Sequence, residues 1–268
     1  MENCRLILDP PAAGAWNMAV DESLLAEAVD GNVATLRFYQ WMEPTLSLGH
    51  FQRYDDRFQH PASTHCAVVR RQSGGGAIVH DRELTYSLTL PAGQPLSRDA
   101  TALYTAVHNA FIHTLAPRLP TGETTRHLRL NGKKSPLAAS AEPFLCFLRR
   151  ACGDLLLVVE QRHQGRATKS APLAYKILGS AQRRHRGAIL QHGSLLIARS
   201  PAAPELPGWQ ELTGESLPLD ELIPGLVRQF FRLLPFEAQP MELPAAIRVA
   251  AREIEKNKYS SRSWTARR

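Results

Sequence analysis

The middle of the chain, where short β-type segments follow one another closely, constrains the fold most. Such segments cover residues 34–39, 45–48, 67–71, 77–79 and 84–89, and no helical pattern separates them. Further strands are predicted at 154–159, 175–182 and 188–197, the last two joined by a hairpin turn at 183–187. This clustering is typical of an α+β fold rather than of regular βαβ alternation. We therefore expect a mixed or antiparallel central sheet with flanking helices.

Apolar residues at helical spacing predict helices around this sheet. Asn17 can cap a first helix that ends before Gly31, and Ser97 precedes a second helix that Pro117 stops. The apolar stripe of the second helix consists of Leu103, Ala106, Val107, Ala110, Phe111 and Leu115.

The character of the sequence changes after Ser200, so we predict a main unit over 1–200 and a helical extension over 201–268 that packs on it. Three prolines follow within 201–207, then an apolar segment at 219–234 that contains Pro224. A last helix from about Leu243 is expected to bury Ala246, Ile247, Ala250, Ala251 and Ile254. The mostly polar stretch 161–172 is predicted as a flexible insertion between two strands.

The 268-residue chain has a formal net charge of +7, and much of the excess lies near its end. Residues 248–268, the basic tail, contain seven Lys or Arg against two Glu. This tail is either a solvated helix face or a landing surface for an acidic partner. No nucleic-acid recognition motif accompanies the charge, so a nucleic acid is not expected as partner.

The four cysteines, Cys4, Cys66, Cys146 and Cys152, show neither CxxC pairing nor zinc-ligand spacing. The sequence has no charged-then-apolar leader and no apolar run near the ~20 residues that a membrane helix needs. We therefore expect a cytoplasmic protein with free thiols, no membrane association and no metal site.

The densest chemical signal is the block 70–81, which reads RRQSGGGAIVHD. Three consecutive glycines cost backbone entropy, so either a tight turn or a ligand lying on the backbone must require them. The flanking Arg70 and Arg71 favour a ligand with a phosphate or a polarised carbonyl, whereas a plain hairpin loop remains the alternative. The block is neither a P-loop nor a dinucleotide-binding fingerprint, because no Gly-Lys-Ser/Thr follows and a strand comes next.

Lys176 and Cys146 are interesting mainly as a pair. Lys176 lies in the apolar, strand-like segment YKILGSAQ, where a lysine either alternates outward or points into a pocket. Cys146, in PFLCFL, is either a small core residue or a nucleophile. A thiolate about 4 Å from an ammonium gains about 4 kcal/mol at an effective dielectric near 20. Cys146 therefore becomes a candidate nucleophile if Lys176 lies beside it.

His80 and His192 are candidates for a general base or a substrate hydrogen bond, with a structural role as the alternative for each.

Taken together, the sequence resembles the biotin/lipoate protein ligase superfamily over residues 16–197. The resemblance rests on five motifs in the same order: NMAVDE at 17–22, LRFYQW at 36–41, PTLSLG at 44–49, the 70–81 block, and KILGSAQ at 176–182. It implies a ligase-like catalytic domain over residues 1–200.

Two branches of this superfamily compete. Lipoate–protein ligases activate the acid with ATP as an acyl-adenylate, whereas cysteine-dependent octanoyltransferases move octanoate from acyl carrier protein through an acyl-enzyme thioester. The segments ELTYS at 83–87, CF at 146–147 and LQHGSL at 190–195 resemble the transferase branch. That branch uses no cofactor, while the ligase alternative would need ATP and Mg²⁺.

In the transferase reading, the resemblance makes Cys146 the acylated nucleophile, while Lys176 keeps its thiol ionised and binds the acyl carbonyl. The residues implied to line the acyl slot or steer the incoming lysine are Arg71, Ser73, Gly74, Gly75, Gly76, His80, Gly179, Ser180, Ala181 and His192. The implied reaction takes an octanoyl or lipoyl group from acyl carrier protein to a lysine of a lipoyl-domain protein such as glycine cleavage H protein.

The implied carrier protein is acidic, which gives the basic tail a possible partner. A third reading is a non-catalytic relative that binds acylated or lipoyl proteins.

Overall fold

The computed structural model describes residues 2–132, 142–163, 166–167, 171–233 and 236–268. Its strands in chain order are β1 (Glu2–Leu8), β2 (Ala34–Tyr39), β3 (Thr45–Leu48), β4 (Ala67–Arg70), β5 (Ile78–His80), β6 (Glu83–Leu90), β7 (Thr124–Leu130), β8 (Leu155–His163), β9 (Arg166–Ala167), β10 (Leu173–His185), β11 (Ala188–Leu196) and β12 (Phe236–Pro240). The α-helices are α1 (Gly14–Asp30), α2 (Pro95–Arg98), α3 (Ala100–Leu115), α4 (Trp209–Thr213), α5 (Leu219–Leu233), α6 (Ala245–Ile254) and α7 (Arg262–Thr265). Shorter turns of helix are η1 (Tyr54–Gln59), η2 (Pro61–Ser63), η3 (Ala116–Arg118), η5 (Cys146–Leu148) and the π-turn η6 (Glu255–Tyr259).

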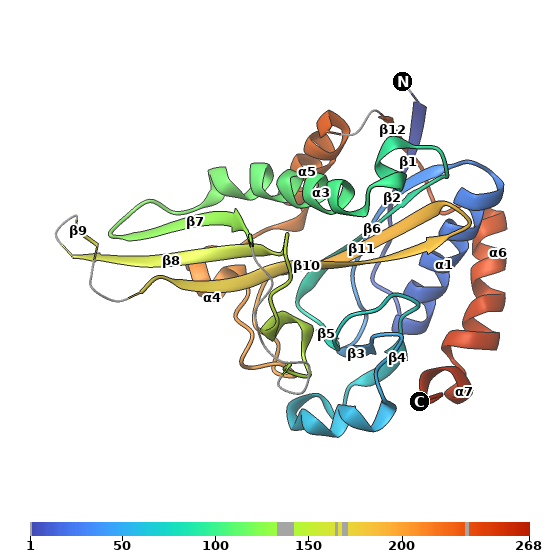
Figure 1. Ribbon diagram of the computed structural model, residues 1–268, viewed down its shortest axis with the longest axis horizontal. Coiled ribbons are helices and arrows are strands. Elements are labelled where there is room, and N and C mark those ends of the chain that lie inside the picture. The colour runs from blue at the N-terminus through green and yellow to red at the C-terminus, as the bar shows by residue number, and fades with distance from the viewer. Residues whose placement is uncertain (1, 133–141, 164–165, 168–170, 234–235) are drawn as a thin grey trace.

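The large sheet has the order β12-β1-β2-β6-β11-β10-β8-β7, with β9 paired to β8 (Figure 1). β1 runs parallel to both of its neighbours, and the remaining pairs of this sheet are antiparallel. A small sheet, β4-β3-β5, lies below it. The predicted α+β fold with a mixed sheet and flanking helices is confirmed.

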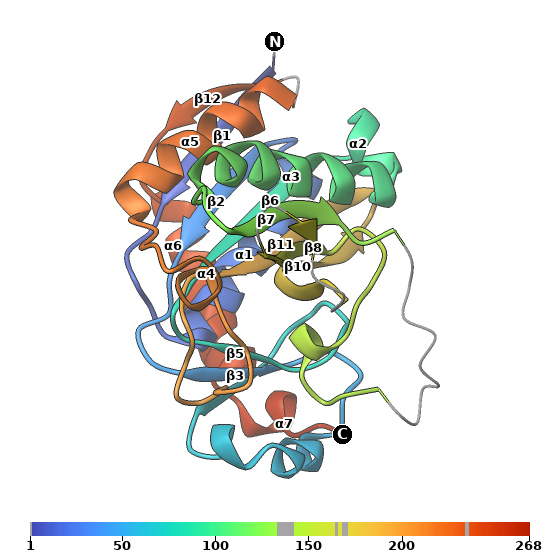
Figure 2. The same ribbon diagram turned by 90° about the vertical axis from the view of Figure 1, so that its left-hand side faces the viewer.

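Helices cover both faces of the large sheet (Figure 2). Alternate residues of a strand point to opposite sides of a sheet, so apolar side chains on both faces can pack against helices. Leu6 and Phe38 belong to the core cluster that includes α3 and α5, whereas Ile7 and Tyr39 belong to the cluster that includes α1 and α6. The small sheet lies on the side of α1, and the space between the two sheets holds the site described below.

The start of α1 differs from the prediction. The helix begins at Gly14, so Asn17 lies inside it and does not cap it. Its buried side-chain amide donates to the carbonyls of Ala12 (3.2 Å) and Gln40 (3.1 Å), and its oxygen accepts from Arg37 (2.9 Å). α3 follows Ser97 as predicted and is capped by Asp99, whose carboxylate accepts from two backbone N–H groups at 2.9 Å.

The observed strands also differ from the predicted ones in their boundaries. β10 continues through most of the turn predicted at 183–187, which shrinks to Arg186 and Gly187, both with positive φ. Part of the predicted insertion 161–172 is strand, since β8 extends to His163 and pairs with β9, while residues 164–165 and 168–170 lie outside the described residues. β1, β7 and β12 were not predicted.

The segment after residue 200 joins the rest of the fold at several places. α5, which runs through Pro224, packs on α3, and α6 packs on α1. β12 pairs with β1 at the edge of the large sheet. On α6, Ile247 and Ala251 are buried, but Ala246 and Ala250 are exposed, contrary to the predicted stripe. The domain boundary at residue 200 stays a prediction.

Candidate active site

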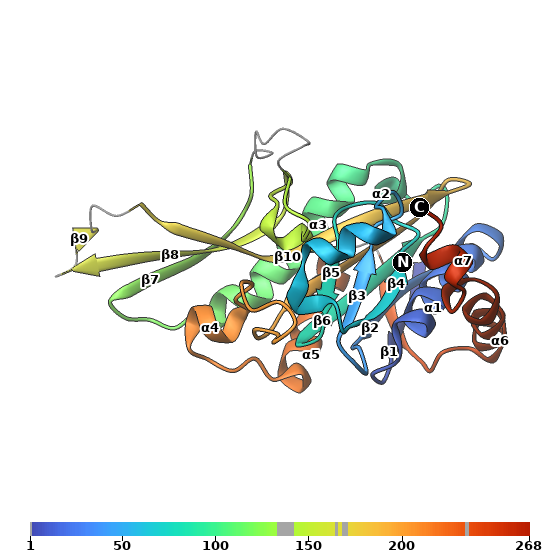
Figure 3. The ribbon, with the colours of Figure 1, turned by 90° about the horizontal axis from the view of Figure 1, so that it is seen from below.

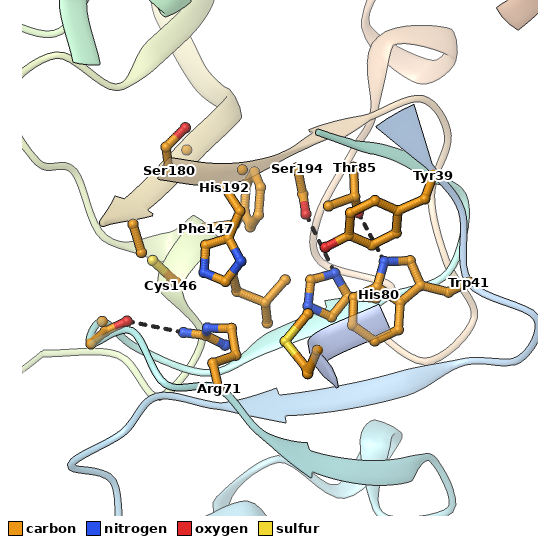
Figure 4. A pocket seen from close by; sticks show the side chains of 17 residues that line it. Tyr39, Trp41, Arg71, His80, Thr85, Cys146, Phe147, Ser180, His192 and Ser194 are labelled. Carbon is orange, nitrogen blue, oxygen red and sulfur yellow. Dashed lines mark hydrogen bonds between the residues drawn. The ribbon is translucent and has the colours of Figure 1, made fainter. Parts of the chain in front are cut away.

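A narrow pocket between the two sheets brings together segments that are far apart in the sequence (Figure 4). It contains about 480 Å³ of space, part of it open to solvent, and most of its lining is apolar. One wall comes from β10 and β11, the other from the tri-glycine loop and β5. The lining residues are Met18, Tyr39, Trp41, Arg71, Gly74, Gly75, Ile78, His80, Thr85, Cys146, Phe147, Gly179, Ser180, Ala181, His192, Gly193 and Ser194.

Cys146 and Lys176 meet at this pocket. The half-buried Cys146 opens η5, which is fixed to the tri-glycine segment because its N–H donates to Ala77 O at 2.7 Å. Lys176 Nζ lies 3.7 Å from Cys146 Sγ and 3.3 Å from Cys146 O. Nζ also forms an ion pair with Asp154 at 2.9 Å. The sulfur is thus exposed to the pocket, with an ammonium on its other side.

The strand backbone explains how Lys176 reaches the sulfur. A β-bulge shifts the β10–β8 register between Lys176 and Leu178, which redirects the side chain. A Cβ atom at Gly179 would overlap the end of the Lys176 side chain. Burial favours neutral Lys176, but Cys146 and Asp154 outweigh it and raise the lysine pKa, so the side chain is an ammonium.

Asp154 and Tyr104 complete this group, and sequence reasoning missed both. Asp154 also accepts from Tyr104 Oη (2.7 Å) and from the backbone N–H of Ala151 (2.6 Å). Tyr104 Oη in turn accepts from the N–H of Ser180 at 3.1 Å. The one available signal was a carboxylate placed directly before an apolar strand, a position where burial requires a partner.

The tri-glycine loop is shaped around the buried Arg71. Its guanidinium donates to the carbonyls of Ser47 (2.7 Å), Gly74 (3.2 Å) and Gly76 (2.9 Å). Burial lowers the Arg71 pKa to about 10, and the nearby Cys146 opposes this shift, so the group stays cationic at neutral pH. Gly75 has a φ of 96°, which suits glycine.

Both histidines are held firmly by neighbours. His80 stacks on Trp41 with 3.8 Å between ring centroids and contacts Glu83 through Nδ1 at 2.6 Å. Burial lowers the His80 pKa although Glu83 opposes it. His192 contacts Ser73 Oγ through Nε2 at 2.6 Å and Asp21 through Nδ1 at 3.2 Å.

Ser180 anchors a buried hydrogen-bond network behind the pocket. Tyr86 Oη lies 2.6 Å from Ser180 Oγ, and His108 Nε2 lies 2.7 Å from the same oxygen. Because His108 Nδ1 donates to Gly153 O at 2.8 Å, Nε2 is the acceptor and Ser180 the donor. Burial, together with the charge of Lys176, lowers the His108 pKa to about 3.

Of the twelve site residues that the resemblance implied, nine line this pocket and three do not. Ser73 lies behind His192, Gly76 holds Arg71 through its carbonyl, and Lys176 contacts Cys146 from outside the pocket. Arg70 does not line it either, and its guanidinium donates to the carbonyls of Gly49 and Thr265. Within the described part of the chain, no group of three or more His, Cys, Asp or Glu could hold a metal ion. None of the helices described is long and apolar enough to cross a membrane.

Comparisons with known proteins bear on the family and the fold of this chain. The sequence profile of the lipoyl protein ligase A/B catalytic domain matches residues 13–203. Octanoyltransferase LipM of Kyrpidia tusciae is 28% identical over the whole of both chains, and that of Carboxydothermus hydrogenoformans is 36% identical over 74% of this chain and 66% of its own. A bi-partite lipoate protein ligase from Thermoplasma acidophilum superposes with a TM-score of 0.69 at 19% identity, covering 99% of this chain and 96% of its own.

The resemblance to the biotin/lipoate protein ligase superfamily is thereby confirmed, and the chain belongs to the lipoyl protein ligase A/B catalytic domain family.

Proposed function

We propose that this protein is an octanoyltransferase of lipoate biosynthesis that works through a thioester on Cys146. The observation that carries the proposal is the contact between Cys146 Sγ and the Lys176 ammonium at the wall of a narrow, mostly apolar pocket. An extended acyl chain fits such a pocket, and a neighbouring ammonium stabilises the thiolate, which is the nucleophilic form of cysteine. The name octanoyltransferase borne by its relatives supports the same reaction.

In the first half-reaction, the Cys146 thiolate attacks the thioester carbonyl of an octanoyl carrier protein. The new S–C bond forms, the carbonyl becomes an oxyanion, and the carbon–sulfur bond to the carrier then breaks. The carrier leaves as a thiolate that takes a proton from solvent. Lys176 Nζ, which already donates toward Cys146 O and Sγ, is positioned to stabilise both the attacking sulfur and the oxyanion.

In the second half-reaction, the neutral amine of an acceptor lysine attacks the acyl-enzyme carbonyl. The amide bond forms while the acyl carbon–sulfur bond breaks, the amine nitrogen gives a proton to solvent, and Cys146 leaves as the thiolate that Lys176 stabilised at the start. Exchange of one thioester for another is nearly neutral in free energy, and formation of the amide is downhill, so this route needs no ATP.

The favoured donor is acyl carrier protein, and the favoured acceptor is a lipoyl-domain protein such as glycine cleavage H protein. The proposed setting is the cytoplasm. An ATP-dependent ligase that forms an acyl-adenylate is the alternative, since the solved structures of similar fold are lipoate protein ligases. The cysteine–lysine contact favours the transferase, because a ligase forms no bond to a cysteine.

Intact mass spectrometry separates these functions. Protein incubated with octanoyl carrier protein, without ATP, should gain the mass of one octanoyl group, and Cys146→Ala should not gain it. Cys152→Ser, the matched control on an exposed thiol, should be acylated like the wild type. Turnover of octanoate only with ATP would identify a ligase. Donor binding without turnover, in wild type and Cys146→Ala alike, would identify a binding protein.

A further inference from the structure

A second cavity opens on the outer side of the Cys146–Lys176 contact. This groove lies where the start of β10, the end of η5 and the chain at 205–207 meet. The ribbon formed by β7, β8 and β10 projects from the rest of the fold (Figure 3). The groove contains about 1050 Å³ of space, part of it open to solvent. Phe147 lines both cavities, and Lys176 lines the groove while its Nζ contacts Cys146 Sγ. Phe147 and Lys176 therefore form the wall between the reactive sulfur and the groove.

The groove combines cationic and apolar side chains. Among the described residues, Arg129, Arg150 and Lys176 line it, and Glu205 is the one acidic residue in the lining. Glu205 is engaged by His60 Nε2 at 2.7 Å, and Lys176 is engaged by Asp154 and Cys146. The two arginines are exposed, and the Arg150 guanidinium is directed by a bond to Ala174 O.

Apolar side chains are unusually exposed along the same groove. Leu148 is 45% exposed and Leu173 is 59% exposed, and both lie beside the buried ring of Phe147. Exposed aliphatic side chains next to two arginines suit a ligand that is apolar in its middle and anionic at one end.

The geometry of the proposed reaction determines which part of a donor lies in the groove. If the acyl chain fills the narrow pocket between the two sheets, the thioester carbon must contact Cys146 Sγ. The rest of the donor must then extend away from that pocket, on the opposite side of the sulfur. We propose that the groove binds the phosphopantetheine arm of the donor, with Arg129 and Arg150 contacting its phosphate. This assignment rests on the proposed acyl-enzyme function. The arm carries amides and a dimethyl-substituted carbon between its thiol and its phosphate, so it offers apolar surface to the exposed leucines and an anion to the arginines.

The experiment compares two donors that differ only in the phosphate: octanoyl-pantetheine and octanoyl-4′-phosphopantetheine. Single-turnover acylation of Cys146 is followed by intact mass, and the ratio of the two second-order rate constants is the readout. Charge-assisted contacts to a phosphate are stronger than neutral hydrogen bonds, and they weaken when the charged groups are exposed. We expect the wild type to prefer the phosphorylated donor by about tenfold and the double variant Arg129→Gln/Arg150→Gln to lose most of that preference.

The control is Arg228→Gln, which removes an exposed arginine of α5 that lines a different cavity. It should keep the wild-type preference, and thermal unfolding should show that all proteins are folded. Equal use of both donors by the wild type, or an unchanged preference in the double variant, would overturn the assignment. A double variant that keeps its donor preference but transfers octanoate slowly to the acceptor would overturn it too, by assigning the groove to the acceptor lysine.

If the proposed function itself is wrong, the same experiment gives a different result. In that case no donor acylates the wild type at all, and both the acyl-enzyme and the groove assignment fall together. Acylation of the wild type without phosphate discrimination leaves the transferase proposal standing and removes only the groove assignment.

Discussion

Replacing Lys176 by methionine should slow the alkylation of Cys146 by iodoacetamide at pH 7. At 3.7 Å and an effective dielectric near 20, the ammonium stabilises a thiolate by about 4 kcal/mol. Because Cys146 is half-buried, water screens part of this interaction, and we take about 2 kcal/mol. An interaction energy of this size limits the loss of alkylation rate to about thirtyfold. Because a more basic thiolate is intrinsically more nucleophilic, part of this loss is offset, and the net loss of rate should be about fivefold to tenfold.

The assay needs a background in which Cys146 is the only reactive thiol. Cys66 and Cys152 are accessible to different degrees and are replaced by serine, whereas Cys4 is buried. Burial raises the pKa of Cys4 to about 12, so it does not compete at neutral pH. The rate of carbamidomethyl addition is then measured by intact mass.

A second substitution separates electrostatics from damage to the fold. Lys176→Met leaves the buried Asp154 without its ammonium partner and should lower the free energy of unfolding by about 3 kcal/mol. The double variant Lys176→Met/Asp154→Asn removes both charges and should regain part of that stability. Its alkylation should stay slow. Alkylation of Lys176→Met at the parent rate, or recovery of the rate in the double variant, would refute the electrostatic argument.

Three further predictions test other parts of the structure. Because the folded-state pKa of His108 is about 3, below the ordinary ~6.5, its contribution to stability is present above pH 6.5 and is lost as the pH falls toward 3. Urea unfolding should show about 2 kcal/mol of this loss by pH 5, and His108→Gln should flatten the slope. Gly49→Ala should displace the tri-glycine loop, because its Cβ would overlap the carbonyl oxygen of Gly75; acylation should fall at least about tenfold while far-ultraviolet circular dichroism is retained. Charge reversal of the exposed tail residues should raise the apparent KM for the acidic carrier protein in low salt, and an unchanged salt dependence would count against a docking role for Arg262, Arg267 and Arg268.

Local patterns predicted the elements whose pairing is also local. The periodic helix α3 and the consecutive hairpin of β10 and β11 were visible because each shows its own alternation or stripe. β12 and β1 were missed because they pair from opposite ends of the chain, and nothing in either segment encodes the other. The predicted cap of α1 was wrong for a related reason, because Asn17 is held by Gln40 and Arg37, which are remote in sequence.

The site residues also divide into those that the local sequence predicts and those that it does not. Tri-glycine and a lysine in an apolar strand are conspicuous because both are costly unless something requires them. The contact between Cys146 and Lys176 could be stated only as a condition, because it depends on a bridge between Ala77 and Leu145 and on the bulge in β10. The role of Asp154 was still harder to predict, because its partners Tyr104 and Lys176 lie in a helix before it and a strand after it in the sequence.

The balance of charge around the sulfur bears on the second half-reaction. Lys176 and the buried Arg71 are cations beside the sulfur, and Lys176 forms an ion pair with Asp154. The acyl group on Cys146 carries no charge, so in the acyl-enzyme these two cations face one carboxylate. An incoming lysine is then disfavoured as an ammonium and favoured as the neutral amine that can attack. Single-turnover decay of the acyl-enzyme should therefore reach its plateau below the ordinary lysine pKa of ~10.4, and a rate that still rises above that pH would contradict this account.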